Sequence, residues 1–150
     1  MASHLIDLRS DTLSMPTREM LESVLTAEMG DDSRDGDPTV LELEALAAGL
    51  MGKEAGLFMP SGTMSNLMAM RTHVEPGATA IVEASAHLYG AEIGGIAAGA
   101  GLLVMPVAGH HGAMDPDALT AAARRVSTLF PTRGILCLEN THNAAGGTVI

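Results

Sequence analysis

The stretch Phe58-Met59-Pro60-Ser61-Gly62-Thr63-Met64-Ser65-Asn66 joins an apolar run to a segment with a helical pattern. A strand that enters a helix through such a turn leaves the first-turn N–H groups unpaired and directs the positive end of the helix dipole at one point, where phosphate groups bind. Ser61 and Thr63 add hydroxyl groups, and Gly62 would let the backbone approach a ligand without an intervening Cβ. The same pattern fits an ordinary helix N-cap without a ligand, so other parts of the chain must decide between the two.

Short apolar runs and helical patterns alternate on both sides of this turn. The expected helices cover about residues 17–27, 37–52, 63–73, 90–98 and 115–126, and the expected strands cover residues 55–59, 80–83, 102–107 and 135–138. This alternation predicts an α/β fold, with a mostly parallel sheet covered by helices on both faces. Ligands bind at the carboxyl ends of the strands in such sheets. That edge would present residues 61–63, 84–89 and 139–143.

The two ends of the chain differ from the middle. Residues 1–15 predict an N-terminal arm, because residues 6–11 alternate apolar and polar side chains without continuing as a long strand. Residues 16–150 then form the N-terminal part of one large domain. Residues 146–150 resemble the start of another strand, which would leave an uncovered sheet edge. We therefore expect the 150 residues to be a fragment of a longer protein.

Composition restricts the possible partners. The net charge of −10 argues against a nucleic acid or an anionic membrane surface, because both favour a basic face. No apolar run reaches the ~18 residues that a membrane span needs, and the N-terminus has no signal-peptide pattern, so a cytoplasmic location is expected. The single cysteine, Cys137, lies in an expected buried strand, which favours an inert thiol over a reactive one.

No metal site is predicted. The loop at residues 30–37 carries four aspartates that could bind a hard cation, but it lacks the spacing and the terminal glutamate of a calcium loop, which favours a solvated loop. No Cys/His spacing indicates a zinc site, and His110-His111 is expected in a turn between glycines. The glycine patterns of dinucleotide and nucleoside-triphosphate sites are also missing.

Polar side chains follow two of the other expected strands. His87 comes shortly after residues 80–83, where an imidazole can lie flat against an aromatic cofactor ring, although a surface histidine is the alternative. Glu92 could place a carboxylate near the same site or be solvated. Residues 139–143, Glu-Asn-Thr-His-Asn, could orient a ligand ring and relay protons, or form an ordinary loop.

Taken together, these motifs resemble one known family. They are Ile6-Asp-Leu-Arg-Ser-Asp-Thr12, Gly30-Asp-Asp with Asp37-Pro-Thr39, Gly52-Lys-Glu54, Ser61-Gly-Thr63, His87 and Glu139-Asn-Thr-His-Asn143. Their order is that of the low-specificity L-threonine aldolases, which are pyridoxal-phosphate enzymes of the aspartate-aminotransferase fold related to the β-eliminating lyases. The resemblance extends from Ile6 to Val149.

The resemblance implies a role for several residues. Ser61, Gly62 and Thr63 would hold the phosphate of pyridoxal 5'-phosphate, and His87 would stack on its pyridine ring and take part in catalysis. Ser10 would help to hold the carboxylate of the substrate.

The family also implies that Glu92 and His142 lie near the reacting centre as catalytic residues. The implied reaction is the reversible cleavage of a β-hydroxy-α-amino acid, a small-molecule substrate, to glycine and an aldehyde. The implied assembly is a homodimer or a homotetramer, and the glycine- and alanine-rich residues 90–101 would suit close packing between subunits.

Some positions depart from the family pattern. The only lysine, Lys53, matches the Gly-Lys-Glu motif and not the cofactor lysine, so this segment alone would be an incomplete catalyst. Arg34 stands where relatives commonly have tyrosine, and Leu129-Phe130 where they often have histidine. A β-eliminating lyase and an aldolase for aryl β-hydroxy amino acids therefore remain alternatives. A non-catalytic phosphate-binding or interaction domain is an alternative of another class.

Overall fold

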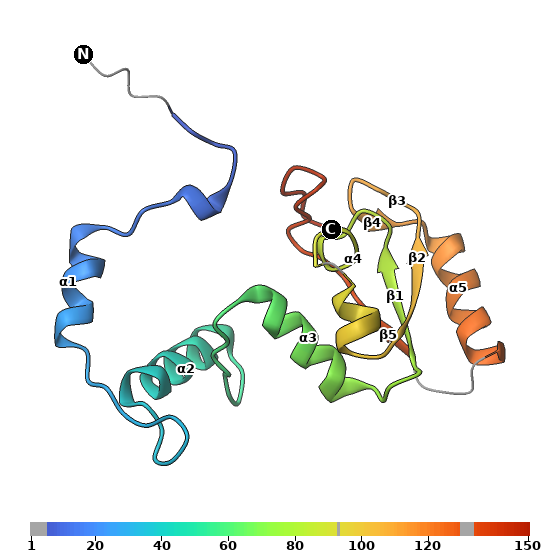
Figure 1. Ribbon diagram of the computed structural model, residues 1–150. Helices are drawn as coiled ribbons and strands as arrows, with labels where there is room; N and C mark the ends of the chain where they lie inside the picture. Colours follow the sequence, from blue (N-terminus) through green and yellow to red (C-terminus); the bar gives the residue numbers. More distant parts are fainter. Residues whose placement is uncertain (1–5, 93, 130–133) are drawn as a thin grey trace. The chain divides into compact units, whose positions relative to one another are not determined.

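The computed structural model describes residues 6–92, 94–129 and 134–150 (Figure 1). The chain divides into two compact units, Met1–Phe58 and Met59–Ile150. The elements of the first unit are η1 (Asp11–Leu13), α1 (Arg18–Thr26) and α2 (Pro38–Met51). Those of the second are α3 (Gly62–His73), β1 (Thr79–Glu83), α4 (His87–Gly90), the π-helix η2 (Gly95–Gly99), β2 (Leu103–Val107), β3 (Gly109–His110), β4 (Ala113–Met114), α5 (Pro116–Leu129) and β5 (Gly134–Leu136).

The helices of the first unit begin and end where the sequence predicts. The side chains of Thr17 and Asp37 each accept a hydrogen bond from a first-turn N–H, and Pro38 occupies the first turn of α2. α2 stops at Gly52, whose φ of 61° lies in the left-handed region that favours glycine. The division into an arm at residues 1–15 and one following domain stays a prediction.

Residues 55–59 do not form the predicted strand. The Phe58 N–H donates to Glu44 Oε1 at 2.7 Å, and a Cβ at Gly56 would lie 2.8 Å from the Glu44 carbonyl oxygen. Residues 55–58 therefore pack against α2 of their own unit, and no described strand pairs with this segment. The prediction was wrong because it rested on apolar side chains alone. A strand also needs a neighbouring strand that pairs with its backbone N–H and C=O groups.

The second unit contains the predicted parallel sheet. Within the described residues its strand order is β2-β1-β5, and both pairings are parallel. β1 pairs with β2 from Thr79↔Leu103 to Glu83↔Val107. The carboxyl ends of β1 and β2 therefore lie at the same edge of the sheet, and the segments that follow β1 and β5 carry the site residues.

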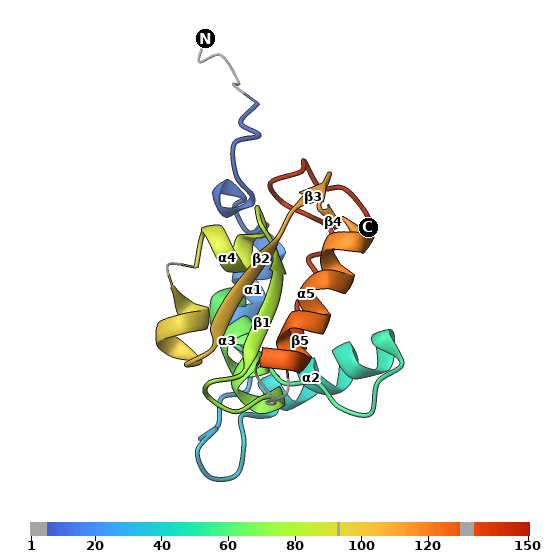
Figure 2. The ribbon, with the colours of Figure 1, turned by 90° about the vertical axis from the view of Figure 1, so that its right-hand side faces the viewer.

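Both faces of β1 are buried, which confirms the predicted α/β class with helices on both sides. Ala80 and Val82 belong to a core cluster with Met70 of α3, whereas Ile81 packs on the other face with Val126 of α5. Figure 2 shows β1 and β2 between α5 on one side and the η2 segment on the other. Burial on two faces explains why Ala80, Ile81 and Val82, which precede Glu83 in β1, are all apolar.

The predicted helix at residues 90–98 is replaced by two shorter elements. α4 begins earlier, at His87, and the π-helix η2 follows after Gly94, whose φ of 72° interrupts an α-helix. A Cβ at Gly99 would lie 2.8 Å from Leu67 Cδ1 of α3. The small residues of this segment thus allow close packing inside the unit itself.

The last strands are shorter than predicted. β5 ends at Leu136 instead of residue 138, although the Cys137 N–H still donates to a β1 carbonyl at 2.9 Å. Among residues 146–150 the structure shows an isolated antiparallel bridge, His142↔Thr148, and whether they start a further strand stays a prediction. In the loop after β5, the backbone groups of His142 bond to Gly147 and Thr148 of the same loop.

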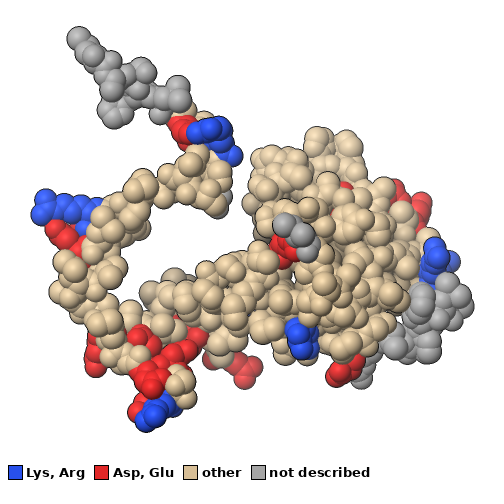
Figure 3. Space-filling model, in the orientation of Figure 1, with Lys and Arg blue, Asp and Glu red and all other residues tan. Residues whose placement is uncertain are grey.

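Acidic side chains gather on the loop between α1 and α2 (Figure 3). Asp31 Oδ1 accepts the Ser33 N–H at 2.9 Å, and Asp37 Oδ2 accepts the Gly30 N–H at 2.9 Å. These bonds stabilise an exposed loop. In the part of the chain that the structure describes, no cluster of three or more His, Cys, Asp or Glu side chains could hold a metal ion.

The longest described helices, α2 and α5, contain 14 residues each. This is shorter than the ~20 residues of a typical transmembrane helix. Among the described residues, no helix combines the length and the apolar composition needed to cross a bilayer.

Candidate active site

The turn that leads into α3 is an N-cap with open space beside it. Ser61 is extended (φ −152°, ψ 152°), and its Oγ accepts the Met64 N–H at 3.2 Å. Its hydroxyl hydrogen remains a donor, and the first-turn N–H groups have no acceptor within the helix. A Cβ at Gly62 would meet no atom of the described residues within 4 Å. A phosphate at this turn would therefore find N–H groups, hydroxyl groups and the helix dipole together.

His87 is the first residue of α4 and is held at two points. Its backbone N–H donates to Glu139 Oε2 at 2.5 Å, and its ring Nδ1 lies 3.0 Å from Glu92 Oε1. The side chain is 46% exposed. The edge of the ring is thus held while much of its surface remains open to a ligand.

Glu92 joins this histidine to α3. Its side chain is only 3% exposed, and Oε1 also accepts a hydrogen bond from Asn66 Nδ2 at 2.7 Å. Asn66 lies four residues, about one turn, after Gly62 on α3. One carboxylate oxygen therefore contacts both the helix with the predicted phosphate turn and the residue predicted to stack on the cofactor.

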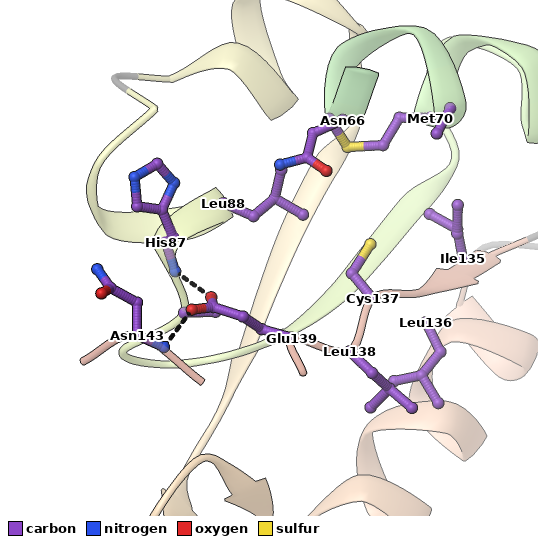
Figure 4. A pocket seen from close by; sticks show the side chains of 12 residues that line it. Asn66, Met70, His87, Leu88, Ile135, Leu136, Cys137, Leu138, Glu139 and Asn143 are labelled. Atoms are coloured by element: carbon purple, nitrogen blue, oxygen red, sulfur yellow. Dashed lines mark hydrogen bonds between the residues drawn. The ribbon is translucent and has the colours of Figure 1, made fainter. Parts of the chain in front are cut away.

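A pocket of about 450 Å³ lies between α3, α4 and β5. Figure 4 shows His87, Glu139 and Asn143 at its polar end and apolar side chains at the other. Glu139 Oε1 accepts the Asn143 N–H at 2.7 Å, so this carboxylate ties the loop after β5 to α4. Residues 61–63 do not line the pocket, whereas Asn66, one turn further along α3, does.

His142 is brought into the core of the second unit and away from the pocket lining. It is fully buried; its Nε2 lies 3.1 Å from Glu83 Oε2, and its Nδ1 accepts the Ala145 N–H at 3.3 Å. Because Nδ1 is an acceptor, the neutral ring carries its hydrogen on Nε2 and donates it to Glu83. Both ring nitrogens are occupied, and a role of His142 in catalysis stays a prediction.

Glu83 is the buried acceptor in this pair. Burial raises the pKa of its carboxyl, but hydrogen bonds from the Ser85 hydroxyl and N–H, at 2.7 and 2.6 Å, and the interaction with His142 lower it more. The net result is a pKa of Glu83 below its usual value. A buried carboxylate with three donors on one oxygen is a structural anchor at the end of β1.

The hairpin β3–β4 packs closely on this pair. His111 (φ 51°) and Gly112 (φ 88°) form its two-residue turn. The predicted turn at His110-His111 is therefore confirmed for His111, whereas His110 belongs to β3 and pairs with Ala113. A Cβ at Gly112 would lie 2.5 Å from His142 Cγ, and a Cβ at Gly109 would lie 2.8 Å from Glu83 Cγ. Glycine at both positions lets the hairpin approach the two buried side chains.

Other residues singled out in the sequence belong to the first unit. Ser10 Oγ lies 2.8 Å from Thr12 Oγ1, and its role toward a substrate stays a prediction. Lys53 is exposed directly after α2, as expected for a cation at a helix C-terminus. Arg34 forms an exposed ion pair at 3.4 Å within the acidic loop. In the second unit, the side chains of Leu129-Phe130 lie outside the described part of the structure.

Two residues that organise the site, Asn66 and Glu83, are not among the predicted site residues, and the partner of Glu139 is not predicted either. Asn66 is one helical turn from Gly62, and this spacing places it on the same face of α3. Glu83 is a carboxylate at the end of a buried apolar run, and such a position requires partners. Glu139 belongs to the predicted polar run at residues 139–143, but local sequence does not indicate its partner, which lies 52 residues earlier.

Comparisons with known proteins identify the relatives of this chain. The chain is 42% identical over 95% of its length to low-specificity L-threonine aldolase 1 of Arabidopsis thaliana, covering 41% of that protein. It is 42% identical over 93% of its length to low specificity L-threonine aldolase of Escherichia coli K12, covering 42% of it. For low specificity L-threonine aldolase of Saccharomyces cerevisiae, the identity is 43% over 71% of this chain and 28% of the relative.

The chain spans about two fifths of the length of the first two of these curated relatives. The family model described as beta-eliminating lyase matches residues 7–150, which includes both the turn at Ser61 and the loop after β5. This match and the identities to the aldolases show that the chain belongs to the beta-eliminating lyase family.

Proposed function

We propose that the full-length protein binds pyridoxal 5'-phosphate and cleaves β-hydroxy-α-amino acids, such as L-threonine or L-allo-threonine, to glycine and an aldehyde. The observation that carries this proposal is the link between the α3 N-terminus and His87 through Asn66 and Glu92. This link supports a cofactor site that would combine the turn at Ser61 with the half-exposed imidazole of His87 in one unit. The names of the relatives support aldol cleavage as the reaction.

The residues present fit this cofactor. The hydroxyl groups of Ser61 and Thr63 and the first-turn N–H groups of α3 would hold the phosphate, in the open space beside Gly62. The His87 ring would lie against the pyridine ring. When bound, pyridoxal phosphate supplies the sink for the electrons released as the substrate Cα–Cβ bond breaks. The site residues of the second unit include no lysine, so we propose that the cofactor-binding lysine belongs to the part of the relatives' length that this chain does not span.

The cleavage also needs a base for the β-hydroxyl proton of the substrate. Two of the three residues that the resemblance implies to be catalytic, Glu92 and His142, are buried, and each already contacts two polar groups. We therefore propose that they position other groups and that neither is this base. Ser10 is proposed, from the family resemblance, to help to hold the substrate carboxylate.

Location and assembly are part of the same proposal. We propose a cytoplasmic homodimer or homotetramer. The family resemblance of the sequence motifs supports this assembly. Light scattering coupled to size-exclusion chromatography of the full-length protein measures the assembly, and a monomer would contradict it.

The Thr63→Ala variant of the full-length protein tests the phosphate site. Loss of a hydrogen bond to a charged group costs about 1.5–3 kcal/mol, so we expect pyridoxal phosphate to bind roughly ten- to a hundred-fold more weakly. Thr72→Ala, at the other end of the same helix, is the matched control and should retain wild-type affinity. Unchanged affinity in Thr63→Ala would remove the phosphate-site assignment.

A coupled assay for acetaldehyde tests the reaction. With L-threonine or L-allo-threonine, the full-length protein should release acetaldehyde and glycine in equal amounts. A β-eliminating lyase would instead release ammonia and a keto acid. Ammonia without aldehyde, from any β-hydroxy amino acid offered, would contradict aldol cleavage while leaving the family assignment intact.

A further inference from the structure

Glu92 is the buried carboxylate that connects the two halves of the proposed cofactor site. It lies in the segment between α4 and η2, and its side chain is 3% exposed. A single oxygen, Oε1, lies 2.7 Å from Asn66 Nδ2 and 3.0 Å from His87 Nδ1. The two contacts come from separate elements, α3 and α4.

The contact to Glu92 determines which nitrogen of the His87 ring carries the hydrogen. An ionised carboxylate only accepts hydrogen bonds, so Nδ1 must be the protonated nitrogen of the neutral ring. The backbone of His87 is held independently, because its N–H donates to Glu139 Oε2 at 2.5 Å. The rotation of the ring is then the main remaining freedom, and Glu92 restricts it.

We propose that Glu92 is a positioning residue that sets the orientation and the tautomer of His87 and couples this ring to the phosphate-binding end of α3 through Asn66. In this role Glu92 acts through His87 and Asn66, which its Oε1 contacts. This inference rests on the proposed function for its purpose, namely the presentation of an imidazole face to the cofactor ring. The hydrogen bonds themselves do not depend on that function.

The physical reason is that a buried carboxylate holds its donors tightly. Hydrogen bonds to an ionised group are roughly twice as strong as those between neutral groups. A buried charge that loses its hydrogen-bond donors is destabilised, because it has been removed from water without replacement partners. A displacement of Asn66 or of His87 would therefore be opposed through the same oxygen. Residues that support a site in this way hold its geometry to within about 0.5 Å.

The variants Glu92→Gln and Glu92→Ala distinguish positioning from simple charge. Glutamine keeps an oxygen at the place of Oε1, which can accept from both Asn66 and His87, whereas alanine removes it. Glu75→Ala, at an exposed position of the same unit, is the matched control. All variants are made in the full-length protein.

The first measurement is the nitrogen-15 NMR spectrum of the histidine rings, recorded without cofactor at about pH 8.5, above the usual histidine pKa of ~6.5. The His87→Gln variant identifies the His87 signals. We expect the hydrogen on Nδ1 in the wild type, in Glu92→Gln and in Glu75→Ala, and a change toward the Nε2–H form in Glu92→Ala. An unchanged His87 tautomer in Glu92→Ala, or a wild-type ring protonated on Nε2, would overturn the proposal.

The second measurement is the dissociation constant of pyridoxal 5'-phosphate. We expect Glu92→Ala to weaken binding roughly ten-fold and Glu92→Gln to stay within about three-fold of the wild type, because only alanine loses both hydrogen bonds. Equal losses in the two variants would overturn the positioning role. Should Glu92→Ala fail to fold, an altered His87 tautomer in the folded Glu92→Gln protein would overturn it as well. A wild type that binds no pyridoxal phosphate would refute the proposed function, and the ring spectra would still decide whether Glu92 holds His87.

Discussion

Replacing Gly112 by alanine tests the packing of the β3–β4 hairpin on the buried pair of Glu83 and His142. At a φ of 88°, alanine adopts a left-handed conformation that costs about 1–2 kcal/mol. Its Cβ would also lie 2.5–2.7 Å from three atoms of His142. Because this ring is fully buried and bonded at both nitrogens, it has little room to move, and overpacking of this kind costs about 1–3 kcal/mol.

Alanine also restricts the unfolded chain, which offsets about 0.4–1 kcal/mol of the loss. We therefore expect Gly112→Ala to lower the free energy of unfolding by about 2–4 kcal/mol. Urea unfolding of the full-length protein, followed by far-ultraviolet circular dichroism, measures this change. The slope of the unfolding free energy against urea should stay unchanged.

Gly77→Ala is the matched control. Gly77 has a φ of 90°, and a Cβ there would meet no atom of the described residues within 4 Å. Gly77→Ala therefore has the same backbone strain and the same effect on the unfolded chain, but no steric clash. The free energy of unfolding should fall by about 1–3 kcal/mol more in Gly112→Ala than in Gly77→Ala. Losses that agree within about 0.5 kcal/mol would refute the reasoning, because they would show that His142 does not oppose a side chain at position 112.

Two further properties follow from the titratable groups. Because the pKa of Glu83 is lowered in the folded protein, its carboxylate stabilises the fold above the unfolded-state pKa of ~4.3, and this contribution is lost as the pH falls through the folded-state pKa. The wild type should therefore lose more unfolding free energy than Glu83→Gln between pH 7 and about pH 3, and equal losses in urea titrations would argue against the effect. Burial raises the pKa of the Cys137 thiol, so at pH 7.5 iodoacetamide should label Cys137 more slowly in the folded protein than in urea. Peptide mass spectrometry measures the two labelling rates, and equal rates would contradict an inert thiol.

Local rules in the sequence identified most element boundaries. The caps at Asp37, Ser61 and Asp115 each involve a side chain that accepts an N–H three residues later, so nearby residues suffice to predict them. The burial of β1 on both faces likewise follows from its apolar run. Residues 55–59 carry an equally apolar run and form no strand, because strand formation depends on a partner that the run itself does not contain.

The sequence by itself therefore determined the α/β class, the N-cap turn at the start of α3 and the family of the chain. Only the tertiary structure decided which polar side chains contact one another. In the tertiary structure, Glu92 contacts His87 and Asn66. Glu139 accepts a hydrogen bond from the backbone N–H of His87, and His142 is buried against Glu83. Three of these contacts join residues 26, 52 and 59 positions apart. Side chains of these types also occur in solvated loops. Their partners here depend on how the sheet brings distant segments together, and no local sequence pattern shows this.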